Sequence, residues 1–232
     1  MEKNVPERNI SSRKVFELVF NILNHISIVT VAIHATYYCY LMYMSGKLRT
    51  QYHMHVWFCT IGYQLLMAES ILTLYSNNYW SLIFTPKTKR NVHWILQVVG
   101  SAMAIFGSVI FYLVRKFHFM RLHSILGLIS LILVVISGFN GISALWSYEI
   151  FKKYRIRPVI LKIFHNFIGI SAFVVGMASL YYGHDYQYFG RLDGTDIDFS
   201  PWLQAIVILT TTLSLTGAVI AFYGQFKSIT GL

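Results

Sequence analysis

Residues 92–114 read VHWILQVVGSAMAIFGSVIFYLV, a stretch with no Asp, Glu, Lys or Arg and a single histidine, His93, near its start. A helix needs about 20 apolar residues to cross roughly 30 Å of hydrocarbon, so this stretch is long enough to span a membrane. Similar stretches lie on both sides of it. The sequence therefore predicts an all-α membrane protein with six transmembrane helices, at residues 18–44, 53–75, 92–114, 120–146, 160–183 and 202–225.

The composition supports a membrane protein and excludes several other classes. Of the 232 residues, 56% are hydrophobic and only 12% are charged, whereas charged residues make up about 25% of an average soluble domain. This excludes a disordered chain and a basic nucleic-acid-binding domain, and two cysteines are too few for a disulfide scaffold. The lipid bilayer, and no nucleic acid, is the expected partner. We expect a segment at 1–17, one domain at 18–225 with an uncleaved first span, and a tail at 226–232.

The basic residues predict the orientation of the chain. There are 19 Lys and Arg against 9 Asp and Glu, a net charge of +10. With six spans, the N-terminal segment, the links around 76–91 and 147–159, and the C-terminal tail share one side, and most of the Lys and Arg lie there. The positive-inside rule therefore predicts that both termini are cytoplasmic.

Four of the nine histidines lie near the starts of spans 2 to 5: His55, His93, His123 and His165. Because successive spans run in opposite directions, His55 and His123 are expected near the non-cytoplasmic face, and His93 and His165 near the cytoplasmic face. Ionisable residues inside a membrane mark function by default, and two imidazoles facing each other across a bundle can bind a haem iron. We expect spans 2–5 to form a four-helix bundle that holds two haems, with spans 1 and 6 peripheral.

Small residues support this interpretation. Gly62, Gly100, Ser130 and Ala172 each lie seven residues after a proposed ligand, on nearly the same helix face. They would leave room for a haem, although small residues also serve close helix packing. The alternative is a haem-free transporter or channel in which these histidines move protons or a metal.

The remaining histidines carry weaker expectations. His53 points away from His55, and His25 and His34 look like packing or interfacial residues on opposite sides of span 1. His118, before span 4, either touches substrate or is wetted by headgroups, and His184 is expected to be solvated. Glu69 either faces the level of the second haem or pairs with a nearby base, and Cys39 and Cys59 either form a bridge or, preferably, pack as small apolar residues.

The following segments carry a resemblance to a known family: HVWFC (55–59), Gly62, MAE (67–69), RNVHW (90–94), His118, HSILG (123–127) and HNFIG (165–169). In this order and at these separations, the chain resembles the cytochrome b561 family of ascorbate-dependent transmembrane electron carriers over about residues 18–225. It is most similar to the short, single-domain "cytochrome b561 domain-containing" type.

The resemblance implies a transmembrane oxidoreductase with two haem b per chain, one on His55 and His123 and one on His93 and His165. It implies ascorbate as the cytoplasmic donor and monodehydroascorbate or a ferric chelate as the acceptor. Lys89, Arg90 and Lys162 are then the candidates for binding the donor anion, and His118 is a candidate on the opposite side. The resemblance favours an endomembrane over the plasma membrane and allows a homodimer. A quinone-linked subunit of a larger complex is a third hypothesis.

Overall fold

The computed structural model describes residues 12–184 and 198–231. Residues 1–11 and most of the predicted link between spans 5 and 6 lie outside this part of the chain. The described residues are helical, with no strand among them. The helices are α1 (Ser12–Met44), α2 (Thr50–Thr60), η1 (Ile61–Met67), α3 (Ala68–Thr73), η2 (Tyr79–Ile83), α4 (Pro86–Val114), α5 (Leu122–Leu145), α6 (Ser147–Tyr154), α7 (Pro158–Gly183) and α9 (Ser200–Thr230).

The six predicted spans are confirmed. Six helical segments are long and apolar enough to cross a membrane, and α2, η1 and α3 together make the second of them. Many large apolar side chains on the outside of these helices are exposed, among them Phe16, Leu113 and Trp202, as expected of a surface that faces lipid tails. The chain is an integral, multi-pass membrane protein.

Three of the predicted spans are shorter than their helices by six or more residues. α4 begins at Pro86, α1 begins at Ser12 and α9 continues to Thr230, so part of the expected N-terminal segment and most of the expected tail are helical. A helix satisfies its backbone hydrogen bonds internally, so it can continue past the point where its side chains become polar. The starts of α4 and α7 have a clear local cause, since each has proline in its first turn, where the missing N–H costs nothing.

The second span contains a π-helical segment, η1, between its two α-helical parts. Such segments are rare in proteins and often occur at functional positions. Three side chains of η1 are buried: Tyr63, Gln64 and Met67. The irregular turn thus lies at the centre of the protein, where this span meets other helices on several sides.

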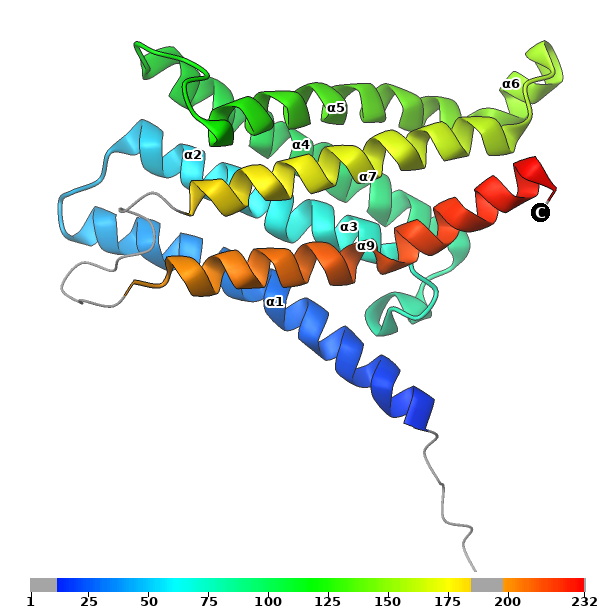
Figure 1. Ribbon diagram of the computed structural model, residues 1–232, viewed down its shortest axis with the longest axis horizontal. Coiled ribbons are helices and arrows are strands. Elements are labelled where there is room, and N and C mark those ends of the chain that lie inside the picture. Colours follow the sequence, from blue (N-terminus) through cyan, green and yellow to red (C-terminus); the bar gives the residue numbers. More distant parts are fainter. Residues whose placement is uncertain (1–11, 185–197, 232) are drawn as a thin grey trace, which may run out of the picture.

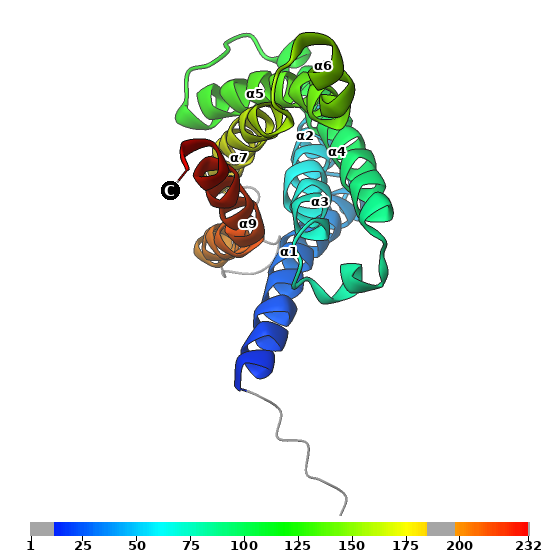
Figure 2. The same ribbon diagram turned by 90° about the vertical axis from the view of Figure 1, so that its right-hand side faces the viewer.

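Spans 2 to 5 are arranged as two halves (Figures 1 and 2). In the first half, α4 packs along α2, η1 and α3. In the second half, α5 packs along α7. Contacts within each half are far more extensive than contacts between the halves. α1 and α9 pack against each other and against the second span, and α9 also packs against α7. The start of α1 and the end of α9 lie at the same end of the molecule (Figure 1).

The first half is held together at two glycines. A Cβ on Gly62 would lie 2.7 Å from the carbonyl oxygen of Gly100, and a Cβ on Gly100 would lie 2.9 Å from that of Gly62. These two glycines therefore allow the second span and α4 to approach closely. Of the two roles expected for them, the structure supports helix packing.

Candidate functional site

The four histidines singled out in the sequence meet in two pairs. The ring centroids of His55 on α2 and His123 on α5 are 5.9 Å apart, with the ring planes at 81°. Those of His93 on α4 and His165 on α7 are 6.3 Å apart, at 90°. Each pair joins one helix of the first half to one helix of the second half. The pairs lie near opposite ends of the bundle, as the sequence predicted.

Each of the four imidazoles uses its Nδ1 atom in the same way. The Nδ1 of His55 lies 3.2 Å from the carbonyl oxygen of Gly107, and that of His93 lies 3.0 Å from the carbonyl oxygen of Ser70. The Nδ1 atoms of His123 and His165 lie 2.7 and 3.2 Å from the carbonyl oxygens of Ser179 and Ser137, respectively. In every case the carbonyl belongs to the neighbouring helix of the same half.

These contacts determine which nitrogen of each ring is protonated. A carbonyl oxygen can only accept a hydrogen bond, so each Nδ1 carries the proton and donates it. The Nε2 atom of the neutral ring then keeps its lone pair. A second hydrogen bond that fixes the tautomer and the ring orientation in this way is typical of histidines that bind metals.

The spacing and the donor set of each pair fit a haem. An imidazole nitrogen binds a metal ion at about 2.0 Å, so two rings opposed across one iron have their centres about 6 Å apart. Both observed separations agree with this value. Within the described residues, no three His, Cys, Asp or Glu side chains come together, and each pair offers the two nitrogens that the axial positions of a haem require.

Serine and glycine residues complete the surroundings of the rings. The hydroxyl groups of Ser70 and Ser179 donate to the backbone oxygens of His93 and His123, at 2.8 and 2.9 Å. A Cβ on Gly141 would lie 3.1 Å from the ring of His165, and a Cβ on Gly183 would lie 3.0 Å from that of His123. A larger side chain at either glycine would push the ring out of place. The ring of His55 is also stacked on Phe111 (centroids 5.0 Å apart).

A third contact crosses between the halves, midway between the two histidine pairs. The Tyr63 hydroxyl on η1 lies 2.8 Å from Ser130 Oγ on α5, and Ser130 donates to the carbonyl oxygen of Ala172 on α7. The Tyr63 ring occupies the space that a Cβ on Gly176 would fill. Tyr63 is 5% exposed, so it fills the centre of the bundle between the two levels.

No pattern in the sequence indicates most of these supporting residues. Gly107, Ser70, Ser137 and Ser179 act through backbone carbonyls, which every residue has. Gly141 lies 24 residues before His165 in the sequence but beside it in space. Only the excess of small residues on spans 2 to 5 could have indicated that rings and helices approach closely here.

The predicted substrate residues lie at the ends of the bundle. Lys89, Arg90 and Lys162 lie within the first turns of α4 and α7, one turn from His93 or His165. Arg90 and Lys162 are exposed, and Lys89 is partly exposed. His118, at the opposite end, is stacked on Tyr112 with ring centroids 4.0 Å apart. The three basic residues thus lie at one end of the bundle, and His118 lies at the other.

Two other histidines differ in their surroundings. His53 is buried and lies against Tyr38 of α1, whereas His55 lies beside His123. His25, expected as a packing or interfacial residue, pairs with Glu69, and this confirms the second alternative for Glu69.

The expectation for His184 is wrong. His184 directly follows α7 but is only 2% exposed instead of solvated. Burial, together with the nearby His34 and His123, lowers the pKa of His184 to about 3. The sequence places His184 beyond the end of a span, but it does not reveal that neighbouring helices cover that end.

Both cysteines are free. Cys39 is partly buried and Cys59 is buried. The Cys59 thiol lies 3.6 Å from the carbonyl oxygen of Ala104 and 3.5 Å from Ser108 Oγ. The preferred alternative, two small packing residues without a bridge, is confirmed.

The fold and the site together define a class of protein. It is a multi-pass membrane protein whose central helices bring together two pairs of histidines that can bind a metal. The family described as "Eukaryotic cytochrome b561" matches residues 54–190. This is more than half of the chain, and it includes all four paired histidines. The chain belongs to the cytochrome b561 family. Membership implies haem b binding and haem-dependent electron transfer across a membrane. No curated protein matches the chain.

Proposed function

We propose that this chain is a two-haem transmembrane oxidoreductase. His55 and His123 hold one haem b, and His93 and His165 hold the other. The observation that supports this is that all four Nδ1 atoms donate to backbone carbonyls, so that each Nε2 atom carries the lone pair that binding to iron requires. Each haem supplies an iron that changes its charge by one, so that electrons can be passed on singly. The functional unit is the domain at 18–225.

The donor enters on the side of His93 and His165, which is the cytoplasmic side if both termini are cytoplasmic. Ascorbate is a monoanion at neutral pH, and Lys89, Arg90 and Lys162 supply positive charge at this mouth. Clustered basic side chains raise the local concentration of an anion and orient it. These three residues therefore bind the donor. The hydrogen bonds from Nδ1 to backbone carbonyls hold the rings of the nearby His93 and His165 in place during electron transfer.

The acceptor binds on the opposite side, near His55 and His123. Monodehydroascorbate or a ferric chelate is the proposed acceptor, with His118 at the mouth. The half-buried ring of His118 is held by stacking on Tyr112, so one imidazole edge is presented in a fixed direction. The membrane is an endomembrane of a vesicle or the endoplasmic reticulum, and a homodimer is the proposed assembly.

An optical spectrum tests the proposal. The full chain, purified after expression with added haem, is expected to contain two haems and to be reduced by ascorbate. Replacing His55 or His123 with alanine should remove one haem and leave the other, and replacing His93 or His165 should do the reverse. A chain without haem would contradict the proposal and favour the transporter alternative. Loss of both haems in every variant would contradict two separate sites.

A test of the donor site uses the basic residues. Lys89→Ala, Arg90→Ala and Lys162→Ala should each raise the ascorbate concentration needed for half-maximal reduction, without changing the haem content. Lys152→Ala, on the same side of the membrane but in the exposed pair with Glu149, is the matched control and should leave the concentration unchanged. An equal effect of Lys152→Ala would show only a general attraction of anions.

A further inference from the structure

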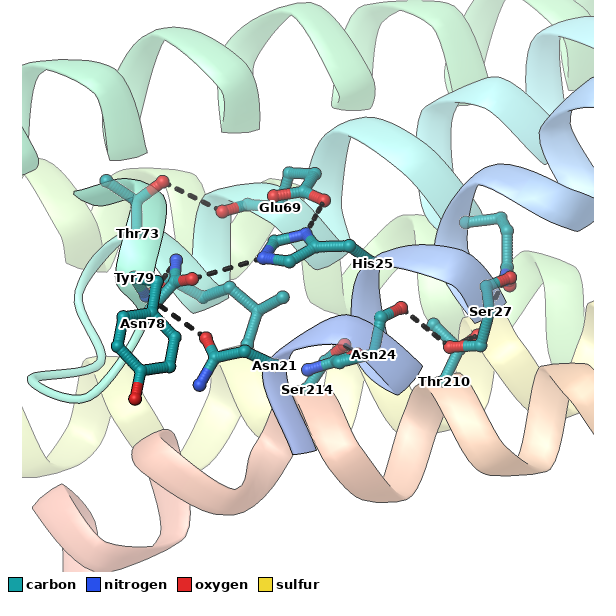
Figure 3. Close-up of polar contacts among 12 residues, drawn as sticks. Asn21, Asn24, His25, Ser27, Glu69, Thr73, Asn78, Tyr79, Thr210 and Ser214 are labelled. Carbon is teal, nitrogen blue, oxygen red and sulfur yellow. Dashed lines mark hydrogen bonds and ion pairs between the residues drawn. The ribbon is translucent and has the colours of Figure 1, made fainter. Parts of the chain in front are cut away.

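A second group of polar side chains lies away from the two histidine pairs, on membrane-spanning helices and on the link after the second span. We call it the polar seam; it lies where α1 meets the second span, the link that follows it, and α9 (Figure 3). Its members are Asn21, Asn24, His25, Ser27, Gln64, Glu69, Asn78, Thr210 and Ser214. Most of these side chains bond to one another, whereas the paired histidines bond to backbone carbonyls.

His25 and Glu69 are the titratable residues of the polar seam. The Nδ1 atom of His25 lies 2.7 Å from Oε1 of Glu69, and its Nε2 atom lies 3.2 Å from Oδ1 of Asn78. The Asn78 amide is oriented by its Nδ2 group, which donates to the carbonyl oxygen of Leu72 at 3.0 Å. Its oxygen therefore faces His25 as an acceptor.

This geometry describes a pair that has taken up a proton. Asn78 Oδ1 only accepts, so Nε2 of His25 must donate. The short contact to Glu69 then needs a proton between Nδ1 and the carboxylate as well. Without that proton, two lone pairs would face each other at 2.7 Å. The pair thus holds one exchangeable proton between His25 and Glu69.

The pair is partly exposed and lies near one end of the span, where we expect water to reach it. The side chains of His25 and Glu69 are 30% and 18% exposed, and Glu69 is four residues from the end of α3. The other titratable groups around the pair are Glu17 on α1, Tyr75 and Tyr79 on the link after α3, and His93 on α4. Between Thr210 and Gly217, where it faces the polar seam, α9 carries no titratable residue.

The same helix that carries Glu69 also holds His93. Ser70, the next residue of α3, donates to the backbone oxygen of His93 through Oγ, and its carbonyl accepts from the Nδ1 of His93. The pair and the proposed site on His93 and His165 are therefore separated by the width of one helix. Two charges separated by the width of one helix interact far more strongly inside a protein than they would in bulk water. A charge on the pair therefore affects a charge at the His93–His165 site.

We propose that His25 and Glu69 form a proton-binding site whose occupancy is linked to reduction of the site on His93 and His165. When that site gains one electron from the donor, the pair takes one proton from water at the same face. Neutral His25 becomes an imidazolium next to the Glu69 carboxylate. The added proton offsets the added electron, so the summed charge of the pair and the haem site does not change. When the electron leaves, the proton returns to water. The proposal rests on the proposed function, because it needs the haem on that pair.

The linkage can be measured on the full haem-containing chain. Linkage is reciprocal: if reduction favours proton binding, protonation favours reduction to the same extent. We expect the reduction equilibrium constant of the His93–His165 haem to fall with rising pH. The limit for one proton per electron is tenfold per pH unit, which is about 59 mV for one electron. Electrochemical reduction in weakly buffered solution, with mediators that carry no protons and with a pH-indicator dye, should show the matching uptake of protons.

Variants assign the proton to the pair. Glu69→Gln keeps an acceptor for His25 but removes the charge, and it should abolish the pH dependence of this haem while the other haem is unchanged. His25→Gln should do the same. Ser214→Ala, a change in the polar seam at a group that does not titrate, and Glu149→Gln, a change at an exposed carboxylate, should retain the pH dependence.

Three results would overturn the linkage. One is a native chain with both haems whose potentials do not change with pH. Another is reduction of the native chain without proton uptake, a measurement that does not depend on any variant being folded. The last is a pH dependence that persists in both Glu69→Gln and His25→Gln, which would assign it to other groups. Absence of haem from the native chain would instead refute the proposed function, so the two failures are distinguishable.

Discussion

The bundle and the polar seam use histidine in two different ways. In the bundle, each ring donates one proton to a backbone carbonyl, keeps a lone pair on its other nitrogen, and lies next to a second imidazole. In the polar seam, both nitrogens of His25 are occupied, one by Glu69 and one by Asn78. His25 therefore cannot serve as a ligand. The partners of the ring, rather than its depth in the membrane, separate the two roles.

The two regions also differ in what a substitution would disturb. A backbone carbonyl cannot be mutated away, so the direction of each paired ring depends on helix packing and on the small residues beside it. The polar seam depends on side chains, each of which can be removed singly. Changes in the bundle should thus act through packing on haem binding, and changes in the polar seam should act on stability or on protons.

The largest effect is expected at Gly141. A valine there would push the His165 ring away from the carbonyl of Ser137 and from His93, because even a Cβ would lie 3.1 Å from that ring. Disturbing the orientation of a metal-binding histidine weakens binding by about 10- to 100-fold. We expect Gly141→Val to lose the His93–His165 haem, as measured by haem content per chain and by the optical spectrum.

Gly138→Val is the matched control for this prediction. Gly138 lies one turn earlier on α5, and a Cβ there would meet no atom within 4 Å. It should keep both haems. If Gly141→Val also kept both haems with unchanged spectra, the ring of His165 would not be held as described, and the distinction between bundle and polar seam would fail.

A smaller effect is expected where the two halves meet at Tyr63. Tyr63→Leu removes the ring that packs on Gly176 and the hydroxyl group next to Ser130. Loss of a large buried side chain with a partner should cost about 2–3 kcal/mol of unfolding free energy. Tyr63→Phe, which loses only the hydroxyl, should cost about 1 kcal/mol. Thermal denaturation in detergent, followed by haem absorbance, measures both.

The relative cost of these two variants decides the role of Tyr63. If the ring matters because it fills the centre of the bundle, the leucine variant must be the less stable of the two. Equal stability of both variants and the native chain would show that the halves are held by the two haem sites alone.

The sequence was sufficient for the spans and for the pairing of His55 with His123 and of His93 with His165. Span length and the alternating direction of helices follow from local composition, so these features needed no tertiary information. The carbonyl partners could not be predicted, because they depend on the axial offset between helices. The pairing of His25 with Glu69 required the rotation of α1 against the second span, and the burial of His184 required knowing which helices cover the end of α7.

The buried His184 gives the next effect, and it depends on pH. Its pKa is about 3 in the folded chain, compared with an ordinary value of 6.5. The unfolded chain therefore binds more protons between these values, so stability is full above about pH 6.5 and falls as the pH decreases. At pH 5 the loss should be on the order of 2 kcal/mol.

His184→Asn isolates this contribution. Thermal stability measured from pH 8 to pH 5 should decline less in this variant than in the native chain. His118→Asn, at an exposed mouth of the bundle, is the control and should decline like the native chain. The same slope in all three chains would mean that His184 is accessible to protons in the folded state.

The smallest effect, and the most direct comparison of the two regions, comes from single serine hydroxyl groups. Ser70 Oγ donates to the backbone oxygen of His93, and Ser214 Oγ donates to Asn24 in the polar seam. Both side chains are fully buried, so either alanine variant should lose about 1 kcal/mol of stability. Only Ser70→Ala should also shift the potential of the His93–His165 haem, because its hydroxyl lies 3.0 Å from the Nδ1 of His93. The carbonyl of Ser70 still accepts from that ring in the alanine variant, so the haem should stay bound and its potential should move only slightly.

A redox titration of both variants separates the outcomes. A shift of the haem potential in both variants would mean that the polar seam affects the haem through packing. A shift in neither variant would mean that the backbone carbonyls alone hold the rings in place.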